Sequence, residues 1–391
     1  MNVLYLSWPC MASQYAIDTL EMDCGCNVFP FTHPDYELRY SDSFDETFQE
    51  FTASHHIDFC FSLNFFPLLA ESCHLHGLKY ISIVYDNPQV RLYSYRITYP
   101  TNYVFMFDSE EYENFKSNGI NTVFYTVLPA KIEAYKKLTE NGHFYDNERV
   151  SADISFVGSL YDEEHNLYDR MYQKLDAHTQ GYLDGLLNAQ HQIQGFDLIR
   201  PALTKNILDK IFAVEPYHPK QDSVESLDYI YASYFLERKL TSIERVRYLH
   251  LIGERHPVKL FTLNQNRTFP GVTNMGTTDY YTEMPLVFHN SKINLNFSLR
   301  SIHAGVPLRC MDIIGAGGFL LTNYQKDLFR FFEPGKDFDY FEDEKDLLTK
   351  IDFYLSHEEL RKEIAHNAYE KACNQYSYKA VFTRIFETAF Q

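Results

Sequence analysis

The segment from Asn294 to Tyr324 concentrates residue types that can bind a diphosphate. Its apolar start predicts a strand, and Pro307 then opens a helical pattern that ends at a glycine-rich stretch. Proline is favoured in the first turn of a helix, where its missing N–H is not needed. The free N–H groups and the positive dipole end of such a helix suit a diphosphate. Arg300 and Arg309 can add charge-assisted, bidentate contacts to phosphate.

Asp312 lies one and a half turns into that predicted helix. Acidic residues of nucleotide-binding folds accept hydrogen bonds from the ribose diol, and Asp312 is the candidate for this contact. The alternative is structural: a glycine-punctuated crossover from helix to strand that carries a surface arginine. The residue pattern by itself favours neither interpretation.

A general base would come from the first part of the chain, where two polar residues follow predicted strands. Asp86 follows the apolar run 80–85, and His33 follows the run 27–31. Ligands of doubly wound folds bind at the carboxyl ends of strands, so Asp86 is the first candidate and His33 the second. The alternatives are a turn that begins at Asp86 and an ordinary loop histidine.

Several other chemistries lack support in the sequence. There is no Gly-x-Ser-x-Gly elbow, no Gly-x4-Gly-Lys loop and no Gly-x-Gly-x-x-Gly after a strand, which argues against hydrolases, ATPases and dehydrogenases. Asp337-Phe338-Asp339 has the spacing of a metal-binding pair, but we expect it to lie in a solvated polar loop. Cys24-Gly25-Cys26 has no matching second pair and is interpreted as a turn. We therefore expect no metal and no required cofactor.

Alternation of apolar runs with amphipathic segments predicts the elements that position these residues. Strands are expected at 3–7, 27–31, 57–63, 80–85, 103–107 and 122–128, with helices between most of them. Nearly continuous apolar strands bounded by helices indicate a parallel sheet that is covered on both faces. The fold class is therefore α/β, and the first domain is doubly wound.

A second domain of the same class begins with a strand over 153–159. Further strands are expected at 258–263, 293–297 and 318–322, whereas 161–250 is mostly helical and is interpreted as an insertion. We divide the chain into domains over 1–150 and 151–375 and a last helical segment over 376–391 that packs back on the first domain. The two domains are expected to face each other across a cleft. Ser356 and Glu359 have the spacing of a capping box, which predicts that a helix begins there.

Composition limits the class of protein and of partner. The 391 residues carry a formal net charge of −18, which disfavours nucleic acid and anionic lipid as partners. No apolar run is long enough to span a membrane, and the first residues form a predicted strand without the basic start of a signal peptide. Seven scattered cysteines indicate reduced thiols, so we expect a cytoplasmic protein.

The segment with the candidate phosphate contacts also resembles a known family. Residues from about 271 to 388 are similar to the C-terminal domain of group 1 GT-B glycosyltransferases, most closely to the spore-maturation-protein (CgeB-like) branch. The likeness rests on Leu295-Asn296, Gly305-Val306-Pro307-Leu308-Arg309-Cys310-Met311-Asp312, Gly317-Gly318-Phe319-Leu320-Leu321-Thr322 and the run from Leu360-Arg361 to Ala368. Phe156-Val157-Gly158-Ser159 and Asp86-Asn87-Pro88 resemble two further motifs of that branch.

This resemblance implies a GT-B fold, in which two Rossmann-like lobes face each other, the first for an acceptor and the second for a nucleotide-sugar donor. In the wider group an acid-x7-acid motif holds the donor, and its second acid, which contacts the ribose, corresponds to Asp312. The first acid position is Ala304, so His303 or Arg300 is expected to replace the missing carboxylate.

The resemblance implies three further roles. Gly158 and Ser159 would let a phosphate approach closely, and Tyr281 and Glu283 would border the base. Asp86 and His303 would face the reacting sugar. The expected activity is metal-independent transfer of a sugar, of the hexosyltransferase type, to a glycan, glycolipid or protein acceptor. Two alternatives stay open: a non-catalytic two-lobed protein that binds nucleotide sugars or acts as a scaffold, and a sugar-nucleotide epimerase of the same architecture.

Overall fold

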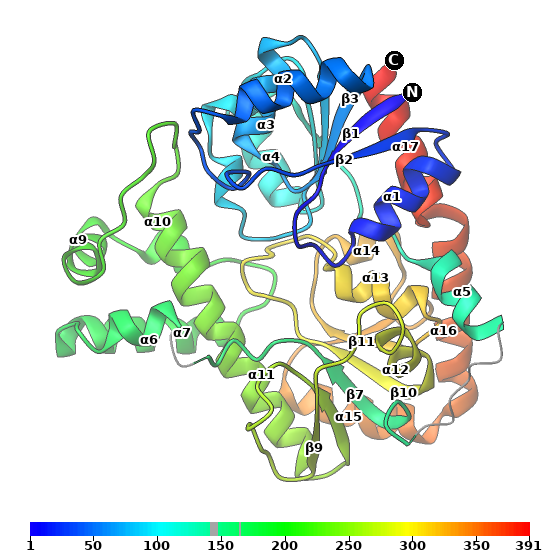
Figure 1. Cartoon of the computed structure of the whole chain (residues 1–391). Coiled ribbons are helices and arrows are strands. Elements are labelled where there is room, and N and C mark those ends of the chain that lie inside the picture. The colour runs from blue at the N-terminus through cyan, green and yellow to red at the C-terminus, as the bar shows by residue number, and fades with distance from the viewer. Residues whose placement is uncertain (141–147, 164–165) are drawn as a thin grey trace. The chain divides into compact units, whose positions relative to one another are not determined.

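The computed structural model describes residues 1–140, 148–163 and 166–391, and the chain divides into two compact units. Unit 1 comprises Met1–Pro129, His218–Glu225 and Gln375–Gln391. Unit 2 comprises Ala130–Tyr217 and Ser226–Asn374. Each unit is built on its own six-stranded sheet with helices around it (Figure 1).

The sheet of unit 1 is entirely parallel, with the strand order β2-β1-β3-β4-β5-β6. The strands are β1 Asn2–Leu6, β2 Asn27–Phe31, β3 Phe59–Leu63, β4 Lys79–Ile83, β5 Asn102–Met106 and β6 Val123–Tyr125. The six strands predicted for this part of the chain are confirmed. Central residues such as Leu4 and Phe61 are fully buried, as expected where both faces of a parallel sheet are covered.

Helices from both ends of the chain pack on this sheet. They are α1 Ser13–Met22, α2 Phe44–His55, α3 Pro67–Leu75, α4 Ser109–Ser117 and α17 Tyr378–Phe390, with short 3-10 turns η1 Val90–Leu92 and η2 Tyr95–Thr98. α17 lies beside α1 (Figure 1). It also packs on β3, where the ring centroids of Phe382 and Phe61 are 5.6 Å apart. The last helix of the chain thus completes the core of unit 1.

The sheet of unit 2 has the order β12-β11-β10-β7-β8-β9 and is also entirely parallel. Its strands are β7 Ala152–Val157, β8 Val258–Phe261, β9 Val272–Gly276, β10 Ser291–Asn296, β11 Leu320–Asn323 and β12 Asp339–Phe341. This is the strand order of the Rossmann fold, with its reversal between β7 and β10. The two edge strands, β9 and β12, are absent from the sequence prediction, because one is largely half-exposed and the other is only three residues long.

Unit 2 has many more helices than unit 1. They are α5 Ile132–Glu140, α6 Leu167–Tyr172, α7 Ala177–His191, α8 Ile199–Ala202, α9 Lys205–Val214, α10 Leu227–Ile230, a π-helix at Tyr231–Leu236, α11 Glu237–Gly253, α12 Met284–Asn290, α13 Leu308–Gly315, α14 Leu328–Phe331, α15 Glu344–Ser356 and α16 Glu358–Gln375. The insertion predicted between β7 and β8 is confirmed as helical. Part of it, His218–Glu225, belongs to unit 1, where Asp222 lies 3.3 Å from Arg39. None of the described helices is long and apolar enough to cross a membrane.

Two local expectations are wrong. The acids of Asp337-Phe338-Asp339 are buried instead of solvated, because Asp337 pairs with Lys371 at 3.0 Å and Asp339, which begins β12, pairs with Lys350 at 3.1 Å. Ser356 is the last residue of α15, not a cap of the next helix. Its hydroxyl donates to two carbonyl oxygens of its own helix, each 2.9 Å away.

Candidate functional site

The strand order of unit 2 places two loops together at the carboxyl edge of its sheet. β7 is followed by Gly158 and Ser159, and the neighbouring β10 is followed by the loop 297–307, which carries Arg300 and His303. Ligands of doubly wound sheets bind at the carboxyl ends of the strands where the order reverses. The structure thus brings these four predicted residues to the edge at which a nucleotide is expected.

Arg245, on α11, ties the two loops together. Its guanidinium donates to the carbonyl oxygen of Ser159 at 2.5 Å and to that of Phe297 at 2.5 and 3.0 Å. Burial lowers the pKa of Arg245. In the part of the chain that the structure describes, no carboxylate lies within ion-pair distance of it, so its charge meets only neutral acceptors. Sequence reasoning missed this arginine because it lies within the helical insertion.

The backbone at Gly158 is more constrained than the predicted phosphate role suggests. Its N–H donates to the carbonyl oxygen of Phe261 at 2.9 Å, so this donor is already used. A Cβ at position 158 would lie 3.3 Å from the ring of Phe156 and 3.6 Å from a guanidinium nitrogen of Arg245. The glycine is therefore explained first by close packing, and Ser159 supplies a hydroxyl that accepts from the N–H of Tyr161.

Arg309 and Asp312 lie on the first turns of α13, as predicted, and form a cluster with a third residue. Arg309 Nη1 is 3.1 Å from Asp312 Oδ2, and Lys131 Nζ is 2.7 Å from Asp312 Oδ1. The side chain of Arg309 is 26% exposed, whereas those of Asp312 and Lys131 are buried. The buried carboxylate thus has a cation on each oxygen, and only Arg309 is open to solvent. Lys131 falls in a segment that the sequence indicated only as a polar helix and linker.

The N-terminus of α13 provides further positive potential. Pro307 is the N-cap residue and the helix begins at Leu308, one residue later than expected. The N–H of Cys310 already donates to the carbonyl oxygen of Pro307 at 2.9 Å. The backbone N–H groups of Leu308 and Arg309 remain at the helix end, where the positive dipole end favours an anion.

Arg300 makes a buried ion pair. Its Nε and Nη2 atoms lie 2.8 and 2.5 Å from the two carboxylate oxygens of Glu244, which also contacts His191 at 3.0 Å. Burial alone would raise the pKa of Glu244, but the charges and hydrogen bonds of Arg300 and His191 hold it below the ordinary value. The bidentate geometry that the sequence suggested for phosphate is thus directed at a carboxylate of α11.

The two residues predicted to border a base lie at the start of α12. Glu283 pairs with Arg149, and although burial alone would raise the pKa of Glu283, the hydrogen bond from Arg149 holds it below the ordinary value. Tyr281 lies edge-on to Tyr280, with ring centroids 5.3 Å apart. Tyr280 also contacts the ammonium of Lys131, so this aromatic pair adjoins the cluster around Asp312.

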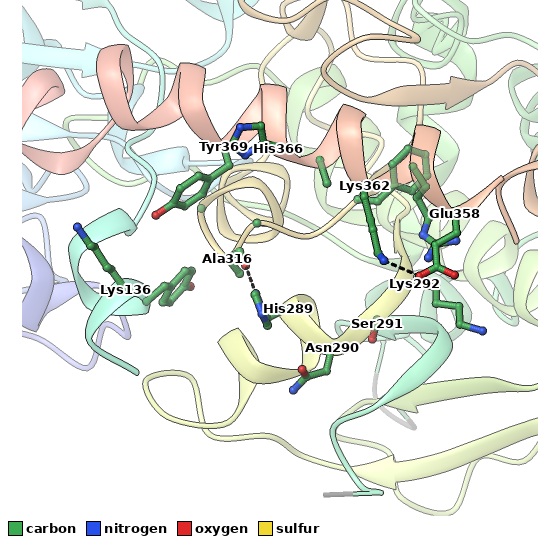
Figure 2. A pocket seen from close by; sticks show the side chains of 16 residues that line it. Lys136, His289, Asn290, Ser291, Lys292, Ala316, Glu358, Lys362, His366 and Tyr369 are labelled. Carbon is green, nitrogen blue, oxygen red and sulfur yellow. Dashed lines mark hydrogen bonds and ion pairs between the residues drawn. The ribbon is translucent and has the colours of Figure 1, made fainter. Parts of the chain in front are cut away.

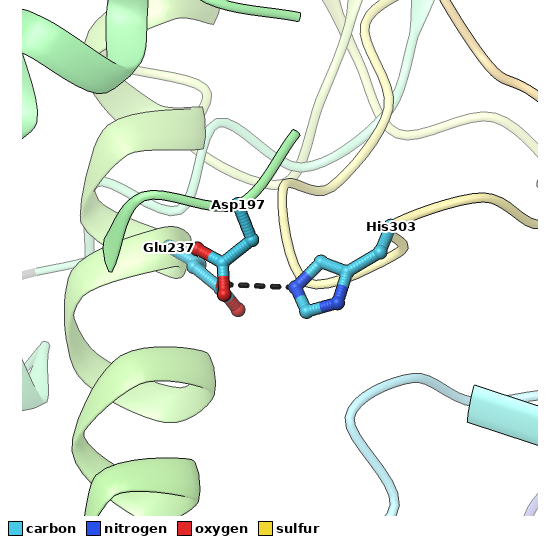
Figure 3. Close-up of side chains that lie close together, drawn as sticks. All are labelled: Asp197, Glu237 and His303. Atoms are coloured by element: carbon cyan, nitrogen blue, oxygen red, sulfur yellow. Dashed lines mark hydrogen bonds and ion pairs between the residues drawn. The ribbon is translucent and has the colours of Figure 1, made fainter. Parts of the chain in front are cut away.

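His303 lies in a cluster of a different kind. Its Nε2 is 2.9 Å from Oε1 of Glu237, the first residue of α11, and Asp197 completes a group of three (Figure 3). Glu237 is almost completely buried, and His303 is 27% exposed. His303 therefore contacts Glu237 and lies near Asp197 instead of standing alone on its loop.

In unit 1, Asp86 follows β4 and is held by Asn64, which follows the neighbouring strand β3. Asn64 Nδ2 donates to Asp86 Oδ2 at 2.6 Å, and Asn64 Oδ1 accepts from the N–H groups of Tyr85 and Asp86 at 2.9 and 3.0 Å. Asn64 is fully buried and has a left-handed backbone with φ of +65°. Asp86 is exposed. Sequence reasoning missed Asn64, although a polar residue directly after a buried strand was a signal that could have found it.

His33, the second candidate base, is buried and shapes its own loop. Its Nδ1 accepts from the N–H of Asp35 at 3.1 Å, and its Nε2 lies 3.4 Å from the hydroxyl of Ser43. Its ring packs edge-on against Phe44 at 5.0 Å. This is the ordinary loop histidine that the sequence left as an alternative.

Unit 2 also contains a cavity of about 560 Å³, on the opposite, amino edge of its sheet (Figure 2). It is lined by the start of β10, the end of α13 and one face of α16. Two of the three lysines that line it are paired, Lys292 with Asp153 and Lys362 with Glu358, both at 2.6 Å. The C-termini of α12 and α13 lie here, and the negative ends of helix dipoles favour nearby cations. Lys292 and Lys362 are therefore accounted for without a ligand.

Part of the carboxyl edge of unit 2, but not β7 with Gly158 and Ser159, lies within the segment that matches a known family. Residues 236–387 match the model of the glycosyl transferase-like family. A search of curated proteins gives no match. The matched segment contains α11, the loop 297–307 and α13, and therefore Arg245, Arg309 and Asp312.

Solved structures resemble the whole chain. Sucrose-phosphate synthase from Thermosynechococcus elongatus is 11% identical with a TM-score of 0.52, and the match covers 99% of this chain and 98% of that one. A glycosyltransferase from Rickettsia africae ESF-5 is 11% identical over 99% and 97% of the chains, with a TM-score of 0.49. HepE from Anabaena, solved with UDP and glucose, is 13% identical over 99% of both chains, with a TM-score of 0.48. The fold class of two Rossmann-like units, as in GT-B glycosyltransferases, is confirmed.

Proposed function

We propose that this chain is a glycosyltransferase that moves a sugar from a nucleotide-sugar donor to an acceptor. The match of 236–387 to the glycosyl transferase-like family carries the proposal, because the matched segment contains the loop 297–307 and α13. The strand reversal between β7 and β10 supports it, since this is where a doubly wound sheet binds a nucleotide. Membership of the CgeB-like branch and transfer of a hexose are parts of the same proposal.

The residues of unit 2 suit the departure of a nucleoside diphosphate. Glycosyl transfer passes through an oxocarbenium-like state while negative charge grows on the leaving phosphate. We propose that this negative charge is stabilised by Arg309, by the N-terminus of α13 and, at longer range, by the buried positive charge of Arg245. Asp312 is held in place by Lys131, and a carboxylate has enough lone pairs to accept a ribose hydroxyl as well. This arrangement needs no metal ion at the diphosphate.

Activation of the acceptor is assigned to unit 1. Asp86 is exposed at the carboxyl end of β4, and Asn64 engages one of its two carboxylate oxygens. The other oxygen makes no hydrogen bond within the described part of the chain, so it can take a proton from an acceptor hydroxyl. The acceptor is proposed to be a glycan, a glycolipid or a protein.

The first experiment is a thermal-shift panel of UDP-, GDP-, dTDP- and CMP-sugars, each with EDTA and with Mg²⁺. A ligand that binds only the native state raises the melting temperature by mass action. We expect stabilisation by one nucleotide family that EDTA does not abolish. No stabilisation by any nucleotide sugar would contradict the proposal, and stabilisation only with Mg²⁺ would contradict metal-independent donor binding.

Turnover then separates the proposed activity from the alternatives. Arg309→Ala should reduce donor turnover strongly while the protein stays folded, and Arg170→Ala, an exposed arginine of α6 paired with Glu215, is the matched control. Wild-type turnover in Arg309→Ala would refute its role. Donor binding without hydrolysis or transfer would favour a non-catalytic protein, and conversion of the donor sugar without an acceptor would favour an epimerase.

A further inference from the structure

We propose that Asp197, Glu237 and His303 form a binding site for one divalent transition-metal ion such as Zn²⁺. One potential ligand atom from each residue lies within 4.8 Å of the other two, and all three residues belong to unit 2. Figure 3 shows the two carboxylates and the imidazole directed toward one another from three different segments. This inference goes beyond the proposed sugar transfer and does not depend on it.

The strongest observation is the state of Glu237. Its side chain is 2% exposed, and Oε1 is 2.9 Å from His303 Nε2. Its other oxygen, Oε2, is shielded from solvent and has no hydrogen-bond partner. A buried carboxylate oxygen is strongly destabilising unless a cation or a donor compensates it. The nearby Arg300 does not provide this, because its guanidinium is directed at Glu244.

Asp197 adds a second carboxylate that is already oriented. Its Oδ1 accepts from the N–H groups of Ile199 and Arg200 at 2.8 and 3.3 Å, which fixes the side chain at the start of α8. Its Oδ2 makes no hydrogen bond or ion pair with any residue that the structure describes. Two carboxylates and a neutral imidazole carry two negative charges, which a divalent cation would balance.

The donor set suits a transition metal better than Ca²⁺ or Mg²⁺. An imidazole nitrogen with two carboxylate oxygens matches the ligands of Zn²⁺ sites, whereas the hard cations prefer oxygen alone. Ligands around Zn²⁺ lie about 3.3 Å from one another, so the group must contract slightly. Asp197 and His303 are only partly buried, so a small shift of their side chains does not disturb a close-packed core. Water would complete the coordination.

The local backbone is consistent with a site at this position. Glu237 directly follows the π-helix Tyr231–Leu236, and π-helical turns occur frequently at functional sites. The three residues come from the turn before α8, the start of α11 and the loop after β10. A bound ion would therefore join the insertion to the loop that carries Arg300, and it would stabilise unit 2 without taking part in donor binding.

The test uses the full chain and no nucleotide sugar, so its outcome is separate from that of the proposed function. Protein stripped with EDTA and dialysed is titrated with Zn²⁺ by calorimetry, and with Co²⁺ by visible absorption, which reports a nitrogen–oxygen ligand set. We expect one ion per chain and a rise in melting temperature. His303→Ala and Glu237→Gln should each weaken Zn²⁺ binding by more than about tenfold, since loss even of a residue that supports a ligand has that effect.

His256→Ala is the matched control, because His256 Nε2 lies 2.6 Å from Asp352 but, among the described residues, forms no group of three ligands. It should bind Zn²⁺ as the wild type does. Glu237→Gln adds a second measurement, the melting temperature in EDTA. If Glu237 is a metal ligand, the variant without metal should melt at or above the temperature of the wild type, because glutamine removes the uncompensated buried charge. Absence of Zn²⁺ binding, unchanged binding in both site variants, or a Glu237→Gln protein that is less stable in EDTA would each overturn the proposal.

Discussion

Asn64 offers a direct test of how the candidate base is positioned. Its side chain makes three hydrogen bonds, of 2.6, 2.9 and 3.0 Å, that fix Asp86 and the backbone at Tyr85. At about 0.5–1.5 kcal/mol each, their loss in Asn64→Ala is expected to lower the free energy of unfolding by about 2–4 kcal/mol. Alanine also fits poorly at a φ of +65°, which adds about 1 kcal/mol.

Asn64→Gly separates these two effects. It loses the same three hydrogen bonds, but glycine adopts the left-handed backbone readily, so it should be about 1 kcal/mol more stable than Asn64→Ala. If Asn64 acts by holding Asp86, both variants should lose kcat by the same factor despite their different stabilities. If Asn64 matters only for folding, the glycine variant should recover activity along with stability.

Urea unfolding and initial rates with a donor that the wild type turns over provide the two measurements. Asn102→Ala is the control, because Asn102 is a buried asparagine of the same sheet whose Nδ2 donates to the carbonyl oxygens of Arg96 and Ile97. Asn102 lies at the amino end of β5, whereas Asp86 lies beyond the carboxyl end of β4. It should lose stability and keep kcat. Wild-type kcat in Asn64→Ala, or a kcat that follows stability across all three variants, would refute the reasoning.

Three further predictions concern unit 2. Arg300→Ala should lower the free energy of unfolding by about 3–5 kcal/mol at pH 7, because Glu244 is left buried without its main partner. Since the pKa of Glu244 is held low, the pair stabilises the protein above the ordinary carboxyl pKa and loses this effect as the pH falls below it, so the difference in melting temperature should shrink below about pH 4. Lys131→Met should lower the free energy of unfolding by less than the loss of about 3–5 kcal/mol that follows when a buried ion pair is fully broken, because Arg309 still contacts Asp312. An equal or larger loss in urea unfolding would contradict this shared pairing. Gly271→Ala should lose more than about 4 kcal/mol or fail to fold, since its Cβ would lie 1.9 Å from the carbonyl oxygen of Gly253, whereas Gly335→Ala, at a similar φ with open space around it, should lose only about 1–2 kcal/mol in the same assay.

The sequence was sufficient for every strand except the edge strands β9 and β12, and it was insufficient for the side-chain pairings at the edges of the sheets. Buried parallel strands are largely apolar, so β1 and β3 stand out in a window of five residues. Lys131 and Asp312 are 181 positions apart, and no spacing in the chain indicates that they meet. Asn64 and Asp86 were nearer to prediction, because Asn64 directly follows β3, Asp86 lies three residues after β4, and these two consecutive strands pair with each other.

The two arginines predicted to bind phosphate differ in a way that only the structure shows. A ligand that recruits Arg300 must break a buried bidentate pair with Glu244, which costs about 3–5 kcal/mol and leaves that carboxylate uncompensated. A ligand that recruits Arg309 Nη1 displaces its 3.1 Å contact with Asp312 and a contact with the sulfur of Met284, and Lys131 continues to neutralise the acid. Both arginines lie between β10 and β11, but only Arg309 can bind a ligand without breaking a buried bidentate ion pair. We therefore expect the first contact to a donor phosphate at Arg309.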